Sequence, residues 1–278
     1  MQKQSFLAVK LFTRNIEFLP YKPISHWRKL AITTWRTSEE ASFYGWMDID
    51  ATAIRKVINE FHTKGLKLSP TAIVAKAVAV SIASYPKVNG VIRFGRIYQR
   101  KSIDIFFQVA PDGTGDTLTG MVVRNCDKKS LREIHEEIQQ RASRIRGGED
   151  DFARFSHIMN RLPAFVIGWL QKLVSFCVYK LNIWSPAFGI PRDAFGSAVV
   201  TSVGMLGIQR GFAPLMPFVE CPAIITVGKI EEKAIVKNGK VEIKEVLSLC
   251  ATMDHRIVDG VGVANMLKTL KAYFENPY

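Results

Sequence analysis

Apolar residues in a helical pattern occupy three long stretches within the first 150 residues, which predicts three helices there. The first covers Ala53–Lys64 and follows two aspartates, which favour a helix start. The second begins at Ser69 and Pro70, with proline in its first turn, and ends at Pro86. Its apolar surface is nearly continuous around the helix, so we expect it to be buried. The third, Ser130–Ile145, has one apolar and one polar face.

Shorter apolar runs, rich in valine and isoleucine, lie between and after these helices and predict strands. They cover residues 91–98, 103–110, 121–123, 197–203, 223–230, 234–236 and 241–251. Helices and strands mixed in this way are typical of an α/β fold with a large mixed sheet. The 278 residues contain neither a linker-like stretch nor an internal repeat, which favours a single domain.

One short motif near the C-terminus carries the strongest chemical signal. Asp254-His255-Arg256-Ile257-Val258-Asp259-Gly260 lies between an apolar run and a helical pattern, so it should join a strand to a helix. A histidine can accept a proton from a thiol or hydroxyl near neutral pH, which is the task of an acyltransferase base. Taken alone, His255 would more often be an ordinary surface or core histidine, because short motifs have many chance matches. We expect Gly260 to permit a tight turn at this junction.

The segment Thr252–Pro277 resembles the C-terminal signature of the 2-oxoacid dehydrogenase acyltransferase catalytic domain, a family related to chloramphenicol acetyltransferase. Four further segments are similar to the family in the same order along the chain: 47–51, 68–89, 129–134 and 201–228. The resemblance implies an α/β, chloramphenicol acetyltransferase-like fold, in which a mixed sheet packs with helices. It implies one catalytic domain over residues 1–278. We expect a stand-alone form, because the chain has no room for the family's lipoyl domain.

The resemblance also implies roles for individual residues. His255 would be the general base in a direct transfer between two bound substrates, without an acyl-enzyme. Thr201 stands where the family has a serine whose hydroxyl, on the neighbouring subunit, stabilises the oxyanion, and threonine keeps that hydroxyl. Ser202 and Gly204, in the same segment, are expected to bind substrate. On its own, Thr201 would be an ordinary strand threonine.

Asp259 joins the catalytic set through the resemblance, although we expect it to hold the histidine loop rather than to exchange protons. In related acetyltransferases the equivalent aspartate pairs with an arginine near the N-terminus, and Arg28 lies in the matching region. Such an Arg28–Asp259 ion pair would be structural and bidentate. Asp254 and Arg256 are expected to anchor the loop.

The chain departs from the family at about residues 149–196, where the family has a short connection. This insertion is rich in Phe, Trp, Leu and Val and predicts a hydrophobic helical element. Its stretch 164–183 is nearly long enough to span a bilayer, but Lys172, Lys180 and two amide residues interrupt it. Three outcomes stay open: a helical hairpin packed on the body or on a neighbouring subunit, a lid or acyl-chain pocket beside the active site, or contact with a membrane surface.

The net charge of +13 is spread along the chain without a basic run or a nucleic-acid motif, so a solvated basic surface is favoured over nucleic-acid binding. The four cysteines, Cys126, Cys177, Cys221 and Cys250, lack metal-ligand spacing, and no metal site is expected. The last three lie in apolar surroundings and indicate buried free thiols in a reducing compartment. Without a signal peptide, we expect a cytoplasmic protein, or one peripheral at a membrane.

The residues and the resemblance together predict a coenzyme A-dependent acyltransferase. Acyl-CoA would be a substrate rather than a bound prosthetic group, and a lipoyl group would have to come from another protein. The acceptor would be a thiol, hydroxyl or amine on a small molecule or a carrier. The protein would be a homotrimer with active sites at the subunit interfaces. Two alternatives remain: transfer to dihydrolipoyl groups supplied in trans, and a non-catalytic trimeric scaffold.

Overall fold

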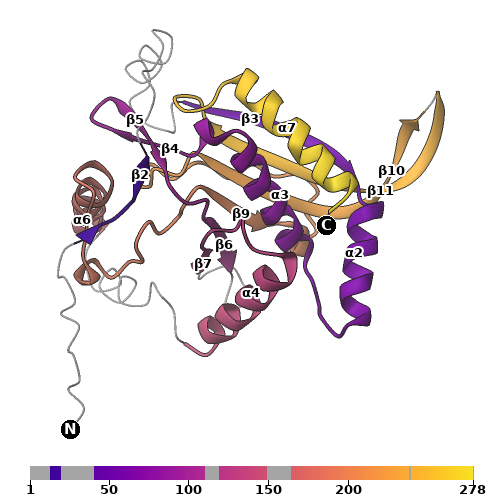
Figure 1. Cartoon of the computed structure of the whole chain (residues 1–278), viewed down its shortest axis with the longest axis horizontal. Helices are drawn as coiled ribbons and strands as arrows, with labels where there is room; N and C mark the ends of the chain where they lie inside the picture. The colour runs from indigo at the N-terminus through magenta and orange to yellow at the C-terminus, as the bar shows by residue number, and fades with distance from the viewer. Residues whose placement is uncertain (1–12, 20–40, 110–118, 149–163, 238, 278) are drawn as a thin grey trace.

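The computed structural model describes residues 13–19, 41–109, 119–148, 164–237 and 239–277 (Figure 1). Its centre is a six-stranded sheet in the order β3-β11-β10-β9-β6-β7. The strands are β3 (Ser42–Asp50), β6 (Ile105–Val109), β7 (Thr119–Val123), β9 (Ala198–Ser202), β10 (Ala223–Lys237) and β11 (Lys240–Asp254). In this sheet β9 runs parallel to β10 and to β6, and the other neighbours are antiparallel. The predicted mixed sheet is confirmed.

Four helices share one core with one face of this sheet, and Figure 1 shows α3 and α7 lying across it. They are α2 (Thr52–Thr63), α3 (Pro70–Ser84), α4 (Leu131–Arg146) and α7 (Gly260–Glu275). The Ser69 hydroxyl accepts a hydrogen bond from the backbone N–H of Ala72 at 3.3 Å, and Pro70 occupies the first helical position. Helix α3 is buried on nearly every side, as its continuous apolar pattern predicts.

The sequence predicts one strand over residues 91–98, and the structure corrects this to a hairpin. β4 (Gly90–Arg93), β5 (Arg96–Arg100) and β2 (Phe18–Leu19) form a second, three-stranded sheet in the order β2-β5-β4. Phe94 and Gly95 between β4 and β5 have φ angles of 45° and 72°, the left-handed pair that a two-residue hairpin turn needs. A bulky apolar residue rarely adopts that conformation, so the apolar pattern hid the turn.

Residues 223–230 and 234–236, predicted as separate strands, belong to the single strand β10. The register of β10 with β11 shifts between Val227 and Ile230. At this point a Cβ on Gly228 would lie 1.9 Å from a neighbouring backbone carbonyl oxygen, so glycine lets another segment approach closely. Three charged residues just beyond the shift interrupt the apolar pattern, which is why the sequence suggests two strands.

The described part of the insertion is largely helical, as predicted. Its elements are α6 (Ala164–Ser175), a π-helical turn η2 (Phe176–Lys180), and β8 (Ile183–Trp184), which pairs with β1 (Thr13–Arg14). Val178 and Tyr179 of η2 pack with Ile16 and Val91, against the three-stranded sheet. The other arm of the expected helical hairpin falls on residues 149–163, which lie outside the described residues.

Short 3₁₀ turns complete the secondary structure of the described chain: η1 (Pro86–Val88), η3 (Pro186–Phe188) and η4 (Gly204–Leu206). Within the described residues, every helix is too short or too polar to cross a lipid bilayer.

The cysteines are free thiols, with one correction to their predicted burial. Cys126, Cys221 and Cys250 are buried, but Cys177 in η2 is partly exposed. Burial raises the pKa of the Cys126 thiol to about 12 and that of the Cys221 thiol to about 11. Both are therefore protonated and poorly nucleophilic near neutral pH.

A buried ion pair ties the end of the insertion to the three-stranded sheet. The side chain of Arg100 on β5 is 1% exposed, and its Nε donates to the Asp193 carboxylate at 3.0 Å. The guanidinium also donates to the carbonyl oxygens of Gly90 (2.8 Å) and Glu220 (2.7 Å). Burial opposes the charge of Arg100, but the Asp193 carboxylate offsets this and raises the pKa of the guanidinium. The insertion is thus fixed to the body by charge as well as by packing.

Candidate active site

The motif around His255 forms the junction between β11 and α7, as the sequence predicts. The carbonyl oxygen of Asp254 accepts hydrogen bonds from the backbone N–H groups of Ile257 and Val258, each at 3.0 Å. These bonds close a tight turn at the end of the strand. The backbone N–H of His255 donates to the carbonyl oxygen of Ala41 at 2.9 Å, which ties the turn to the segment entering β3.

Asp254 and Arg256 form a buried ion pair within this turn. Their side chains are 4% and 8% exposed, respectively. The Asp254 carboxylate accepts from the backbone N–H of Arg256 at 3.0 Å and from Nη2 of the same residue at 2.6 Å. Because this guanidinium folds back onto its own loop, the pair anchors the loop that carries His255, as expected.

The ring of His255 packs beside the ring of Phe43. The two ring centroids lie 5.3 Å apart, and the ring planes are tilted by 57°. Phe43 belongs to β3 and pairs in register with Met253, so strand pairing brings it beside the motif. Nδ1 of His255 is buried. The sequence did not identify Phe43 as a site residue, because the His255 motif lies at the other end of the chain. The one sequence feature that marks its position is an aromatic-rich run before the predicted strand at 47–51.

Asp259 caps the helix that follows the motif. Its Oδ1 accepts a hydrogen bond from the backbone N–H of Gly262 at 2.9 Å, the first-turn bond of an N-cap. Arg28, the expected ionic partner of Asp259, lies outside the described residues. Gly260 does not have the predicted role, since its φ is not left-handed and a Cβ there would meet nothing within 4 Å. The more crowded glycine of this junction is Gly262, where a Cβ would lie 3.1 Å from the Tyr85 ring.

This cap allows a test of what Asp259 contributes. Asp259→Ala removes the acceptor for the Gly262 N–H and should lower the free energy of unfolding by about 1 kcal/mol. Asp259→Asn keeps an acceptor at the cap, so its free energy of unfolding should stay close to that of the wild type. Urea denaturation of the three proteins measures both effects. Equal losses in the two variants would instead assign the stabilisation to the negative charge, as an ion pair with Arg28 requires.

Thr201, Ser202 and Gly204 form the second predicted segment, where β9 ends. Thr201 and Ser202 are partly buried and occupy the last two positions of the strand, paired with β10. Gly204 begins the turn that follows, and a Cβ there would lie 2.6 Å from the carbonyl oxygen of Gly228. Close backbone packing therefore requires glycine at this position, independently of any contact with a substrate.

One chain does not bring His255 and Thr201 together. Thr201 shares a row of the sheet with Thr226 and Cys250, and Cys250 lies four positions before Asp254. With strands ~4.8 Å apart and a rise of ~3.4 Å per residue, Thr201 is on the order of 15 Å from the end of β11. A base and an oxyanion donor must both reach the reacting group. The two residues can therefore act on one acyl group only if they come from different subunits.

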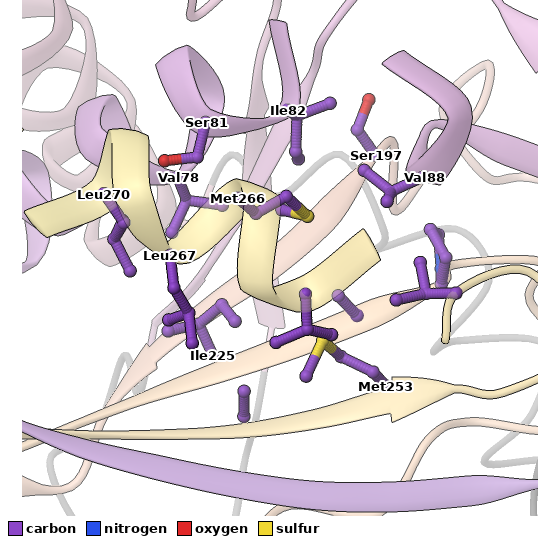
Figure 2. Close-up of a pocket in the computed structure, with 15 residues that line it drawn as sticks. Val78, Ser81, Ile82, Val88, Ser197, Ile225, Met253, Met266, Leu267 and Leu270 are labelled. Atoms are coloured by element: carbon purple, nitrogen blue, oxygen red, sulfur yellow. The ribbon is translucent and has the colours of Figure 1, made fainter. Parts of the chain in front are cut away.

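A small apolar cavity of about 80 Å³ lies between α3, α7 and the sheet, behind the motif (Figure 2). Met253 and Val258, on either side of the histidine in sequence, line it together with Met266 of α7. The hydroxyls of Ser81 and Ser197 at its wall donate to backbone carbonyl oxygens. This volume is well below the ~300–1,000 Å³ of typical ligand pockets, so the cavity is too small for a nucleotide cofactor.

The described part of the insertion does not line the His255 side of the molecule. The three-stranded sheet stands between them. Val91 of β4 packs with Val178 of the insertion, whereas a Cβ at the preceding residue, Gly90, would lie 3.0 Å from the side chain of Ile257 in the motif. The expected lid or acyl-chain pocket beside His255 therefore does not hold, within one chain, for the described residues.

The sheet, its helices and the histidine junction together define the fold of the chloramphenicol acetyltransferases. A solved chloramphenicol acetyltransferase superposes with a TM-score of 0.52 over 89% of this chain and 94% of that one, at 13% identity. A crystal structure of a probable dihydrolipoamide acetyltransferase from Listeria monocytogenes 4b F2365 has a TM-score of 0.64 and 21% identity, over 92% and 94% of the two chains. The predicted fold is confirmed.

The family profile described as 2-oxoacid dehydrogenases acyltransferase (catalytic domain) matches residues 21–155 and 194–278, well over half of the chain. The chain belongs to this family. The unmatched residues 156–193 fall within the predicted insertion. A curated relative is the lipoamide acyltransferase component of the branched-chain alpha-keto acid dehydrogenase complex of Bacillus subtilis (strain 168). It is 25% identical over 265 residues, 91% of this chain and 52% of that protein, so the chain spans about half the length of this relative.

Proposed function

We propose that the protein is a coenzyme A-dependent acyltransferase in which His255 is the general base. The observation that carries this proposal is the fixed position of His255. The residue sits at a strand-to-helix junction, held by the buried Asp254–Arg256 pair and by contact with Phe43. This junction lies in the part of the chain that the acyltransferase family matches.

The reaction follows from the groups at hand. The neutral imidazole of His255 accepts the proton of the acceptor's thiol, hydroxyl or amine as that group attacks the carbonyl carbon of the acyl thioester. The carbonyl oxygen becomes an oxyanion, and the hydroxyl of Thr201 from a neighbouring subunit donates a hydrogen bond to it. The tetrahedral intermediate then expels the coenzyme A sulfur, which takes the proton from the imidazolium. The acyl group passes directly to the acceptor, without an acyl-enzyme or a prosthetic group.

The separation of His255 from Thr201 supports an assembly in which each active site lies between two subunits, and we infer a homotrimer. Exposed apolar side chains near the Thr201 end of β9 and on the outer strand β3 support a subunit interface there. They are Tyr44, Trp46, Met205, Leu206, Ile208 and Phe212. The rings of Tyr44 and Phe212 meet edge to face, with centroids 5.5 Å apart, which joins the two parts of this surface.

The experiment that tests the proposed function is the formation of free coenzyme A, separated by chromatography, from acyl-CoAs of increasing chain length. Dihydrolipoamide, a small alcohol and a small amine serve as acceptors. We expect coenzyme A release that requires both an acyl donor and an acceptor, and an acylated acceptor identified by mass spectrometry. If a folded, assembled protein turns over no donor with any acceptor, the proposal fails, and a non-catalytic scaffold becomes the better account.

A subunit-mixing experiment tests whether the active site is shared. His255→Ala and Thr201→Ala should each impair a homomeric assembly. In mixed assemblies, a site is intact when its His255 comes from a Thr201→Ala chain and its Thr201 comes from a His255→Ala chain. Random mixing of equal amounts makes about a quarter of the sites intact, because each interface is heterologous. Coexpression of the two variants should therefore restore about a quarter of the wild-type kcat. No gain over the separate variants would place both groups of each site in one chain, or Thr201 outside the site.

A dihydrolipoyl group supplied in trans is the second candidate acceptor. The Bacillus subtilis relative is a lipoamide acyltransferase component, which favours this chemistry. The two acceptor classes can be separated by kcat/KM for dihydrolipoamide, for a lipoylated carrier protein, and for the alcohol and amine. A clear preference for the lipoylated carrier would identify the acceptor as protein-bound.

A further inference from the structure

The insertion carries a row of exposed apolar side chains that the proposed acyl transfer does not use. Trp169, Leu173 and Phe176 follow one another at intervals of four and three residues along α6 and η2, so they lie on one helix face. They are 77%, 58% and 46% exposed, respectively. Phe94, at the tip of the β4–β5 hairpin, is 66% exposed and meets the Phe176 ring edge to face at 6.4 Å. We call these four residues the apolar ridge.

The core of the protein does not account for the ridge. The other side of the same helix already anchors the insertion, through Val174, Val178 and Tyr179, which pack with Val91 on the three-stranded sheet. The helix is therefore apolar on two faces, and one of them faces solvent. Three of the four ridge residues, Trp169, Leu173 and Phe176, also lie outside the family match, within residues 156–193.

The two segments that carry the ridge are rich in basic residues. Residues 90–103 and 164–192, which supply the ridge and its supports, contain seven lysines and arginines and neither aspartate nor glutamate. Among the seven, Arg100, Lys180 and Arg192 pair with acidic residues from other segments. Arg96, Lys101 and Lys172 are exposed at the surface. Exposed positive charge therefore lies next to the ridge in sequence, at Lys172 beside Leu173 and at Arg96 two positions after Phe94.

We propose that the apolar ridge docks the protein on an anionic membrane surface, an interaction that goes beyond the proposed acyl transfer. Tryptophan and phenylalanine favour the boundary between lipid headgroups and acyl chains, and lysine and arginine beside them attract anionic lipids. An anionic membrane is negative at its headgroups and apolar beneath them, so exposed apolar side chains with basic neighbours match it. Lys172, next to Leu173 on the helix, can keep its ammonium among the headgroups while its stem lies against the apolar layer.

Vesicle flotation tests this proposal. The wild type should bind vesicles of equimolar phosphatidylcholine and phosphatidylglycerol more strongly than pure phosphatidylcholine, and added salt should weaken that binding. The double variant Trp169→Ala/Leu173→Ala should lose affinity for the mixed vesicles by about tenfold or more, because two apolar anchors are removed. The matched control is Val236→Ala/Ile243→Ala. These side chains are 76% and 74% exposed on the β10–β11 hairpin, which projects on the opposite side from α6 (Figure 1). The control should bind like the wild type.

Light scattering in solution distinguishes a membrane-binding ridge from a ridge that contacts another copy of this chain. The ridge double variant should keep the wild-type assembly mass and thermal midpoint, because its altered side chains are exposed. Absence of binding by the wild type overturns the proposal, as does equal loss in the ridge and control variants. A ridge variant that changes the assembly mass and leaves vesicle binding intact would show that the ridge contacts another copy of the chain.

Discussion

The variant His255→Ala should catalyse acyl transfer about a hundredfold to ten-thousandfold more slowly than the wild type, since a positioned general base contributes a factor of that size. The loss should fall on kcat. The imidazole acts in the transition state, when the proton leaves the attacking group, and contributes little to the binding of either substrate in the ground state. Assays of coenzyme A release at saturating donor and acceptor measure kcat for the two proteins.

Two controls make this result specific to the base. The thermal midpoint of His255→Ala should change little, because the buried Asp254–Arg256 pair and the backbone bonds of the turn remain. Phe43→Leu keeps the base but removes the ring beside it, so it should lower kcat by less than the loss of the imidazole. A His255→Ala enzyme that works within a few-fold of the wild type would remove His255 from the mechanism.

The variant Arg100→Met should lose about 3–5 kcal/mol of unfolding free energy, because it leaves the Asp193 carboxylate buried without its positive partner. The carbonyl oxygens of Gly90 and Glu220 also lose a donor. The double variant Arg100→Met/Asp193→Asn should recover part of this loss, since no uncompensated charge then remains inside. Urea denaturation gives the free energies of unfolding of both variants, when the dependence of free energy on urea concentration is fitted with one common slope.

An exposed ion pair of the same chemistry provides the matched control. Arg55 donates to Glu245 at 2.7 Å, but the two side chains are 45% and 42% exposed. Arg55→Met should therefore cost less than about 1 kcal/mol. Similar losses at the two sites would mean that burial does not set the strength of the Arg100–Asp193 pair.

Features that depend on residues close together in the chain were predictable from the sequence. Ser69 and Pro70 start α3 as they should, and the His255 motif joins a strand to a helix because an apolar run and a helical pattern flank it. The anchoring role of Asp254 and Arg256 was also predictable, because the two residues lie within one turn.

Features that depend on distant pairing were not predictable. Phe43 lies beside His255 only because β3 pairs with β11, and nothing near either residue indicates that pairing. Arg100 finds its partner Asp193 in an insertion that the family match does not cover. The turn at Phe94 was missed for a different reason: its conformation is one that a phenylalanine seldom adopts, so composition argued against it.

The order in which strands pair also affects how the protein reaches its active form. β10 and β11 are adjacent in the chain and close through a turn at Gly239, so this hairpin can form early and locally. β3 must pair with β11 from about 200 residues away in the chain, at a higher entropic cost of loop closure. Phe43 and the Ala41 carbonyl reach the histidine turn through that late pairing. We therefore expect a refolding chain to form the β10–β11 hairpin before β3 brings Phe43 to the proposed base, so acyltransferase activity should return later than the hairpin does.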